Sequence, residues 1–424
     1  KRYRKDNVMD YYKQYLAFNK QYCIHYYKDK TQIRMGLYEA KVLNQLQADV
    51  VEMGTGERTL NEIWENIQLQ YQVDNNEKYR MLFQHMIETL VENDIVQLND
   101  RAKQITIRRF GKRMETYPFW LICELTNKCN FACPHCYKEA SITGQYLDIE
   151  KVRLIVSEFA GYTPNLILTG GESLLHPQIE EVLQMTTGNF KTSLLTNAFL
   201  LKEIDIELLK KIKHIQISMY GYDEESYYRF TGNKKGFQAL SEAFAKIKKC
   251  AGIETLLTLV LTPNNVNELE KYINAAIELG APSMFFGLSL PLGRACKEPD
   301  MFTFTEEENL RIYQLIEQLR LQYKDKIHIT PFQNQVKYIP LKKKGFACQA
   351  GKTNVVINED GLVRGCNLLP SNEFSEYSLE QYIEDVHNGV EKNYEADLEN
   401  IRHHMEERGL TLEDMKCTGF CRIE

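Results

Sequence analysis

Apolar and polar positions follow two different periods along the middle of the chain. Between residues 119 and 330, short apolar runs alternate with longer stretches in which apolar residues recur every three or four positions. The short runs predict strands and the longer stretches predict helices. We expect strands at 119–126, 166–169, 192–196, 215–219, 255–261 and 282–287. We expect helices at 148–159, 176–186, 204–212, 237–249 and 267–279. Six such units predict an α/β fold with a parallel, partial (β/α)6 barrel, and such barrels place their chemistry at the carboxyl ends of the strands.

The stretch before the barrel has a different pattern. Residues 15–33 alternate well enough for one or two strands with a turn near 28–30. Three helix patterns follow: one over 38–51, one starting at Thr59 with Glu62 in a capping-box spacing, and one starting near Asp74. Segments 94–98 and 105–107 then predict the two strands of a wing. Residues 1–112 are therefore predicted to form a winged-helix α+β domain, and residues 113–330 the barrel.

The pattern changes again after the barrel. Two short apolar runs flank the turn residues Asp360 and Gly361, which predicts a β-hairpin. Polar helices are expected near 379–386 and 395–408. Residues 331–424 are therefore predicted to form a third, small domain.

Composition narrows the class of protein. The 424 residues are 43% apolar and carry a net charge of -6, so the chain can bury sizeable cores and has no general attraction for nucleic acid or anionic membranes. No apolar run approaches the length of a membrane span, and no signal peptide is recognised. Eleven cysteines, an odd count gathered in metal-like clusters, favour a reducing, cytoplasmic location.

The strongest chemical pattern is a group of three cysteines directly after the first barrel strand. Cys129, Cys133 and Cys136 are spaced C-x3-C-x2-C. Three thiolates on one loop can bind a four-iron cluster and leave one iron open for a ligand. A zinc knuckle and cysteines without a ligand role are the alternatives. Zinc knuckles usually pair two C-x2-C units, and the chain has no second one.

Residues 129–137, including Tyr137, resemble the signature of radical S-adenosylmethionine (SAM) enzymes. Thr169-Gly170-Gly171-Glu172, after the second strand, resembles the SAM-binding motif of the same family. The resemblance implies that the three cysteines bind a [4Fe-4S] cluster and that Gly170, Gly171 and Glu172 bind the amine of SAM. It also implies reductive cleavage of SAM to a 5′-deoxyadenosyl radical.

Other positions match the family by their place after a strand. Asn197 stands where the family has Asn-Gly, although Ala198 replaces the glycine, and Ser218 stands where a hydroxyl meets the ribose of SAM. Tyr220 and Thr231-Gly232 replace an acidic residue and an Arg-Gly pair, so the partner of the SAM carboxylate stays open among Arg229, Lys234 and Lys235. The cofactor contacts that the resemblance implies, besides the Gly-Gly-Glu motif, are Tyr137, Asn197, Ser218, Arg229, Gly293 and Arg294. His135 is interpreted as a loop residue.

Four further cysteines lie in the third domain. The spacing of Cys348, Gly361 and Cys366 resembles the opening of a SPASM domain, and Cys417 and Cys421 follow near the end. With four cysteines instead of seven, this domain resembles the shorter twitch form with one auxiliary [4Fe-4S] cluster. Buried cysteines and a structural zinc site are the alternatives. Of the remaining cysteines, Cys123 and Cys250 are expected in the core, and Cys296 is a candidate hydrogen-atom donor.

The N-terminal domain invites a DNA-binding interpretation, but its third helix carries Glu77, Glu88 and Glu92, which suit a phosphate backbone poorly. Its pattern instead resembles the peptide-recognition element of radical SAM peptide maturases, in which a precursor's leader adds as a strand. A domain that only packs on the barrel is the alternative. The basic residues that follow are interpreted mainly as a solvated linker, with contact to an acidic leader as the second interpretation: Arg101, Lys103, Arg108, Arg109, Lys112 and Arg113.

The sequence therefore leads to one main functional hypothesis. The chain resembles radical SAM peptide maturases of the sactipeptide type, which implies thioether formation from a cysteine sulfur to a carbon of a ribosomally made precursor. The resemblance also implies a flavodoxin- or ferredoxin-type reductant. Epimerisation and carbon–carbon crosslinking are alternative reactions. An iron–sulfur regulatory protein with an inactive barrel is the alternative outside the enzymes.

Overall fold

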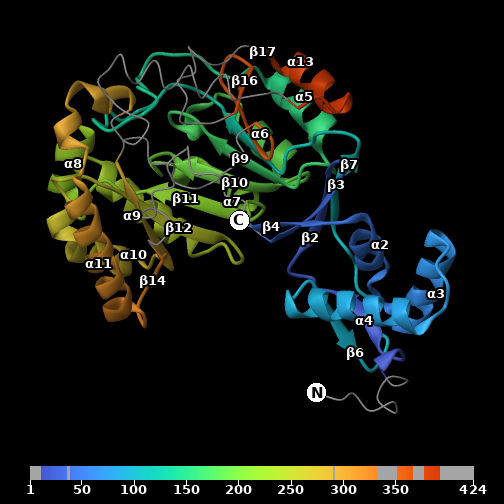
Figure 1. Ribbon diagram of the computed structural model, residues 1–424. Helices are drawn as coiled ribbons and strands as arrows, with labels where there is room; N and C mark the ends of the chain where they lie inside the picture. Colours follow the sequence, from blue (N-terminus) through green and yellow to red (C-terminus); the bar gives the residue numbers. More distant parts are fainter. Residues whose placement is uncertain (1–10, 36–38, 290–291, 332–350, 366–376, 392–424) are drawn as a thin grey trace. The chain divides into compact units, whose positions relative to one another are not determined.

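The computed structural model describes residues 11–35, 39–289, 292–331, 351–365 and 377–391, and the chain divides into two compact units (Figure 1). The first unit extends to Tyr117 and the second begins at Pro118. Each unit has its own sheets and its own buried apolar residues.

Three helices and a three-stranded antiparallel sheet form one part of the first unit. The sheet has the order β5 (Thr55–Thr59), β1 (Tyr15–Phe18), β6 (Val96–Asn99). The helices are α2 (Gln45–Met53), α3 (Leu60–Tyr71) and α4 (Glu77–Glu92). The predicted capping box is confirmed, because the Thr59 hydroxyl accepts from the Glu62 N–H at the start of α3. Trp64 of α3 and Phe83 of α4 pack with 5.2 Å between ring centroids in the centre of the core.

The first unit also contains a four-stranded sheet that is larger than the sequence predicted. Its order is β4 (Glu39–Leu43), β3 (Lys30–Met35), β2 (Cys23–Lys28), β7 (Arg109–Arg113). The predicted turn near 28–30 is confirmed as the β2–β3 turn. Two predictions were wrong. Residues 39–43 form a strand rather than the start of a helix, and the basic residues 109–113 pair in parallel with β2 rather than forming a solvated linker.

The predicted wing is confirmed only in its first strand. β6 pairs with β1, whereas residues 105–107 form no strand. Backbone N–H groups of Lys103 and Ile105 instead donate single hydrogen bonds to Gly56 and Thr55. The apolar alternation at 105–107 reflects packing against the core, where Ile107 is buried.

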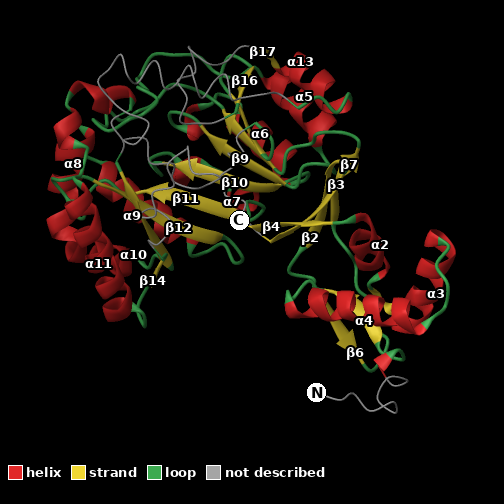
Figure 2. Cartoon of the chain, viewed as in Figure 1, coloured by secondary structure: helices red, strands yellow, loops and turns green. Residues whose placement is uncertain are grey.

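The second unit is built on a ten-stranded sheet whose parallel part contains the six predicted barrel strands. They are β8 (Trp120–Glu124), β9 (Asn165–Thr169), β10 (Lys191–Thr196), β11 (His214–Ser218), β12 (Glu254–Leu261) and β13 (Ser283–Leu288). The predicted helices between them are α5 (Ile149–Phe159), α6 (Ile179–Thr187), α7 (Ile206–Leu209), α9 (Gly236–Ile247) and α10 (Leu269–Leu279). Figure 2 shows the helices around the outside of the strands. The prediction of an α/β partial barrel is confirmed.

Elements beyond the prediction extend the sheet at both edges. A short strand β14 (His328–Ile329), which follows α11 (Glu306–Tyr323), pairs with β13. At the other edge the predicted hairpin is confirmed as β15 (Asn354–Ile357) and β16 (Leu362–Arg364), and β15 lies parallel to β8. β17 (Tyr377–Ser378) and α13 (Leu379–His387) follow, whereas the helix expected near 395–408 lies outside the described residues.

This register brings the carboxyl ends of neighbouring strands to one edge of the sheet. Glu124 of β8 pairs with Thr169 of β9, so the loops that carry Cys129 and Gly170 leave the sheet side by side. Thr196 and Ser218 end the next two strands. None of the helices in the described segments is both long and apolar enough to cross a membrane.

Candidate functional site

The three cysteines of the first motif lie in one loop between β8 and α5, residues 125–147, which we call the cluster loop. Two backbone hydrogen bonds fix the loop: Leu147 N–H donates to Leu125 at 2.9 Å, and Cys129 N–H donates to Ser141 at 2.6 Å. Leu125 N–H in turn donates to Thr169 of β9 at 2.9 Å. The cluster loop is therefore irregular in conformation but fixed at both ends.

The thiols of the cluster loop are close enough for their charges to interact. Burial raises the pKa of Cys129 to about 11, and the charges of Glu172 and Cys136 act in the same direction. Burial and the charges of Cys129 and Cys136 also raise the pKa of Cys133. The thiols of Cys129 and Cys133 therefore stay protonated at neutral pH unless a cation stabilises their thiolates, as metal binding does.

The chemistry of this donor set fits an iron–sulfur cluster. Three soft ligands share one loop, and the ligands of a four-iron cluster bind separate irons rather than meeting at one point. Accordingly, no three His, Cys, Asp or Glu side chains in the described part of the chain converge in a way that would hold a single ion.

Glycines after β9 let the Gly-Gly-Glu segment approach the cluster loop. A Cβ on Gly170 would lie 2.3 Å from the carbonyl oxygen of Thr126, and one on Gly171 would lie 2.2 Å from that of Lys128. Gly170 also has a φ of +138°, which favours glycine. In place of side chains, N–H groups donate to the same carbonyls: Gly171 to Thr126 at 2.7 Å and Glu172 to Lys128 at 2.8 Å.

The carboxylate of Glu172 joins three segments behind this approach. It is 1% exposed and accepts hydrogen bonds from the Thr196 hydroxyl at 2.6 Å, the Asn197 N–H at 2.7 Å and the Leu174 N–H at 3.1 Å. Burial raises the pKa of Glu172, and these three donors oppose that shift. Because a carboxylate has about four acceptor positions, Glu172 keeps capacity for one further donor such as an ammonium.

Asn197 connects the end of β10 to the cluster loop. Its side-chain amide donates to Asn130 Oδ1 at 2.8 Å and lies 3.8 Å from Cys129 Sγ. Ala198, which stands where the family has glycine, adopts a φ of +68°. Ala198 therefore keeps the positive φ that a glycine would adopt at this position.

Arg294 and Gly293 hold the cluster loop from the opposite side of the barrel mouth. The Arg294 guanidinium donates to the carbonyl of Cys133 at 2.6 Å and to that of Ala140, and its backbone N–H donates to Cys136 at 2.9 Å. A Cβ on Gly293, whose φ is +56°, would lie 2.2 Å from the Tyr137 carbonyl oxygen. These three hydrogen bonds of Arg294 all go to the protein's own backbone, so a direct cofactor contact stays a prediction.

The other predicted SAM contacts divide into two groups. Ser218 ends β11, two residues before Tyr220, whose ring contacts Phe131 and His135 of the cluster loop. Arg229 lies on the exposed side of α8 (Glu224–Thr231), close enough for its charge to act on Asp223 and Glu268. The described contacts do not join Arg229 to the cluster loop, so its assignment to the SAM carboxylate also stays a prediction.

A buried group of four charges lies on the other side of the cluster loop, and sequence reasoning missed it. Lys138 Nζ is 2.7 Å from Glu124 Oε2 and 2.7 Å from Glu359 Oε2, and Arg364 Nη2 is 2.6 Å from the same Glu124 oxygen. All four side chains are at most 4% exposed. The group joins the cluster loop, β8 and the β15–β16 hairpin, and no local sequence signal marks partners so far apart.

The four cysteines predicted to bind an auxiliary cluster lie outside the described residues: Cys348, Cys366, Cys417 and Cys421. The described hairpin ends at Gly365, next to Cys366. Cys123 and Cys250 are buried as expected, and Cys296 is partly exposed in a 3-10 turn (Gly293–Lys297).

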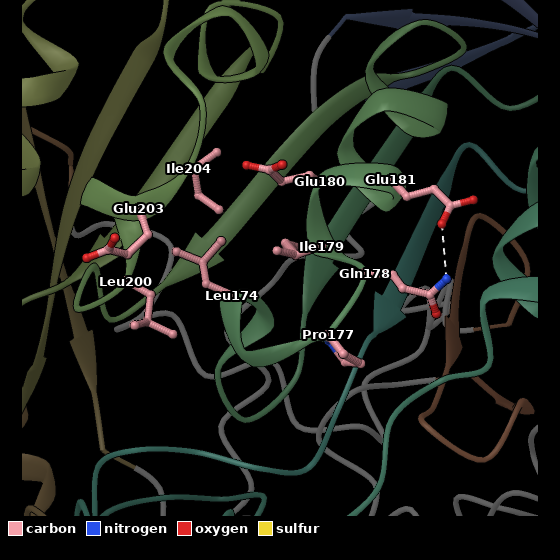
Figure 3. Close-up of a pocket in the computed structure, with 9 residues that line it drawn as sticks. All are labelled: Leu174, Pro177, Gln178, Ile179, Glu180, Glu181, Leu200, Glu203 and Ile204. Carbon is pink, nitrogen blue, oxygen red and sulfur yellow. Dashed lines mark hydrogen bonds between the residues drawn. The ribbon is translucent and has the colours of Figure 1, made fainter.

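A separate open pocket of about 360 Å³ lies between the segments that follow β9 and β10 (Figure 3). Apolar side chains including Leu174, Ile179 and Ile204 line it together with three glutamates, and the Gln178 amide donates to Glu181 at 3.0 Å. None of the predicted site residues lines this pocket. It is therefore distinct from the group of residues around the cluster loop.

The barrel and this group of residues match a known enzyme superfamily. Residues 123–276 match the model of the radical SAM superfamily, and this segment contains the cluster loop, the Gly-Gly-Glu segment, Asn197 and Ser218. Residues 123–276 are therefore a radical SAM domain, the kind of domain that binds SAM and a [4Fe-4S] cluster, and the chain is related to peptide maturases.

Individual relatives cover most of the chain. The antilisterial bacteriocin subtilosin biosynthesis protein AlbA of Bacillus subtilis (strain 168) is 26% identical over 323 residues, 75% of this chain and 69% of AlbA. The sporulation killing factor maturation protein SkfB of the same organism is 24% identical over 272 residues, 62% of this chain and 64% of SkfB. Among solved structures, Streptococcus suis SuiB bound to its precursor peptide SuiA has the same fold, with a TM-score of 0.55 at 12% identity, covering 88% of this chain and 90% of SuiB.

Proposed function

We propose that this protein matures a ribosomally made precursor peptide by forming thioether crosslinks from cysteine sulfur to a carbon of another residue. The observation that carries the proposal is the group of three interacting thiols beside the Glu172–Asn197 junction in a radical SAM barrel. The named roles of AlbA in bacteriocin biosynthesis and of SkfB in maturation of a killing factor support a peptide substrate.

Each residue of the site has a distinct proposed role. Cys129, Cys133 and Cys136 are the ligands of the cluster, which when bound supplies the electron that cleaves SAM to a 5′-deoxyadenosyl radical. Gly170 and Gly171 leave room for the methionyl part of SAM to approach the backbone of this segment. Glu172 accepts a hydrogen bond from the ammonium group of SAM. Asn197 orients Asn130 and Cys129. Arg294 fixes the carbonyl groups of Cys133, Cys136 and Ala140.

The first unit is the proposed site for the precursor's leader. β6 is an edge strand of its three-stranded sheet, and α4 packs against β6. Met81 and Leu82 of α4 are 66% and 56% exposed. An extended leader added beside β6 would pair its backbone with the outer edge of this strand and cover apolar side chains of α4.

The auxiliary cysteines are proposed to bind a second [4Fe-4S] cluster in a twitch-type domain, and a flavodoxin- or ferredoxin-type protein is the proposed reductant. Cys348, Cys366, Cys417 and Cys421 are the proposed ligands. Replacing all four with alanine is expected to remove about half of the iron, because two four-iron clusters contribute equally.

The test of the proposed reaction is anaerobic co-expression with the small peptide encoded beside this gene, followed by high-resolution mass spectrometry. Thioether formation predicts loss of two hydrogens per crosslink and loss of one alkylatable thiol each time. The same mass loss with every thiol intact would indicate a carbon–carbon crosslink, and an unchanged mass with deuterium uptake from heavy water would indicate epimerisation. Either result would overturn the thioether assignment while keeping the enzyme class.

A matched pair of cysteine variants tests the site itself. Cys129→Ala should abolish 5′-deoxyadenosine formation, whereas Cys250→Ala, which alters a buried cysteine three residues after α9, should retain it. Equal formation of 5′-deoxyadenosine by Cys129→Ala and the unaltered chain would contradict the ligand assignment.

A further inference from the structure

Two exposed lysines lie in the turn between α8 and α9. Lys234 and Lys235 directly precede α9, and within the described segments neither of them forms an ion pair. Lys234 Nζ lies 5.5 Å from the ring centroid of Tyr228, which is 44% exposed. Glu242, on which the charge of Lys235 acts, already pairs with Lys202 at 3.0 Å. The turn therefore presents positive charge and an aromatic ring to solvent.

A backbone hydrogen bond joins this turn to the cluster loop. The N–H of Ala132 donates to the carbonyl oxygen of Thr231, the last residue of α8, at 3.2 Å. Ala132 is exposed and is bonded directly to Cys133. Lys234 follows Thr231 by three residues, and three residues span at most about 11 Å. The lysines therefore lie close to a point where the cluster loop itself reaches the surface.

Aromatic packing holds both ends of the turn against the same loop. On the α8 side, the ring centroids of Phe230 and His135 lie 5.0 Å apart, and those of Tyr227 and Phe131 lie 6.1 Å apart. On the α9 side, a Cβ on Gly236 would lie 2.4 Å from the Tyr227 ring and 3.6 Å from that of Phe131. The position of the two lysines beside the cluster loop is therefore fixed by buried side chains.

The cluster has to receive an electron from outside the protein before each cleavage of SAM. Electron transfer slows steeply with distance, so a protein donor has to dock near the cluster loop. Flavodoxins are acidic, and carboxylates surround the exposed, apolar edge of their flavin. Two unpaired lysines beside an exposed tyrosine ring are complementary to such a surface. Complementary charge steers association and sets the orientation of the docked partner, and salt screens it.

We propose that Lys234, Lys235 and Tyr228 form the docking surface for an acidic flavodoxin, which reduces the cluster through the exposed face of the loop at Ala132. One electron leaves the reduced flavin and enters the cluster, and no bond forms or breaks. The proposal rests on the proposed function in one respect, namely that the cluster loop binds a [4Fe-4S] cluster.

The first test is isothermal titration calorimetry of the reconstituted full chain with an oxidised flavodoxin at low ionic strength. Lys234→Glu combined with Lys235→Glu should weaken binding at least about tenfold, because two attractions become repulsions. The control is Lys248→Glu combined with Lys249→Glu, which changes the net charge equally at two exposed lysines after the other end of α9. This control should keep the affinity of the unaltered chain. Equal affinities of the two double variants would overturn the proposal.

Formation of 5′-deoxyadenosine without precursor peptide separates docking from SAM binding. With reduced flavodoxin as the limiting reductant, the Lys234→Glu and Lys235→Glu double variant should react more slowly than the unaltered chain. With excess dithionite, which needs no docking surface, the two should react at the same rate. An equal loss with both reductants would overturn the proposal, because the lysines would then act on SAM.

A milder double variant keeps the test decisive if charge reversal prevents cluster loading. Lys234→Gln combined with Lys235→Gln removes the charges without introducing repulsion, so flavodoxin affinity should fall by a smaller factor. Unaltered affinity in this variant would also overturn the proposal. An unaltered chain that forms no 5′-deoxyadenosine with dithionite would contradict the proposed function instead, and the calorimetric comparison would still decide whether these lysines bind flavodoxin.

Discussion

The ammonium of Lys138 and the carboxylate of Glu124 form a buried ion pair, with 2.7 Å between Nζ and Oε2. Lys138 lies two residues beyond Cys136, and Glu124 is the last residue of β8. The pair therefore connects the cluster loop to the first strand of the barrel, and Glu359 and Arg364 extend the connection to the β15–β16 hairpin.

Replacement of Lys138 by methionine should destabilise the second unit by about 3 kcal/mol, because it leaves buried carboxylates without their shared cation. Urea unfolding can be followed by the fluorescence of Trp120, which begins β8, in a Trp64→Phe background that removes the other tryptophan. Lys210→Met, which removes an exposed pair with Glu207, should not change the midpoint. Equal midpoints for the two variants would contradict a stabilising role of the buried pair.

Replacement of Arg294 by methionine should speed cluster loss. The variant lacks two charge-assisted hydrogen bonds to the backbone of the cluster loop. Loss of about 1.4 kcal/mol or more corresponds to at least roughly tenfold faster release of iron to a chelator. Arg311→Met, at an exposed pair with Glu307, is the matched control and should release iron at the unaltered rate. Identical rates of iron release from both variants would show that the hydrogen bonds of Arg294 do not help to retain the cluster.

Replacement of Gly171 by alanine should weaken SAM binding by at least about tenfold, because the new Cβ would lie 2.2 Å from a backbone oxygen and the segment would have to move. The measurement is equilibrium binding of SAM to the reconstituted protein. Gly188→Ala is the control, since the nearest atom to its Cβ is 3.9 Å away at an ordinary φ. Unaltered affinity in Gly171→Ala would show that close approach at this position is not required.

Acidification should loosen the four-stranded sheet of the first unit through His25, which is 0% exposed. Burial, helped by the charge of Arg34, lowers the pKa of His25 from 6.5 to about 3. The unfolded chain therefore binds a proton between these pH values that the folded chain does not. Stability should fall as the pH decreases from about 6.5 towards 3, by up to about 1.4 kcal/mol per pH unit.

Hydrogen exchange of β2 and β3 peptides in the full chain, corrected for the intrinsic pH dependence of exchange, measures this loss. His25→Gln should flatten the pH dependence, whereas His85→Gln, at an exposed position on α4, should retain it. A slope that stays the same in His25→Gln would assign the effect to another group.

The barrel was predictable from the sequence because its strands and helices differ clearly in period and each repeats several times. The N-terminal unit was less predictable. Val42 and Leu43 fit a helical face with Leu46, but tertiary pairing with β3 overrides that preference, and the helix begins only after the Asn44 cap. The basic segment 109–113 carries no apolar alternation, so its pairing with β2 was not visible.

The site shows the same division. The cysteine spacing and the Gly-Gly-Glu motif identified residues that lie close together in the structure. Each of these motifs occupies a single short segment, so it is visible in the local sequence. Arg364 and Glu124 are 240 positions apart, and their contact depends on β15 lying against β8. No pattern within a short window of sequence records such a contact.

The parallel pairing of β15 with β8 has a consequence for synthesis of the protein. A ribosome makes β8 more than two hundred residues before it makes β15, so the nascent barrel has an exposed edge beside the segment that carries the cysteines. During this interval Glu124 and Lys138 lack their partners from the hairpin. Iron delivered during translation would therefore reach a cluster loop whose contacts with the hairpin have not yet formed. The fold thus favours loading of the metal after the chain is complete.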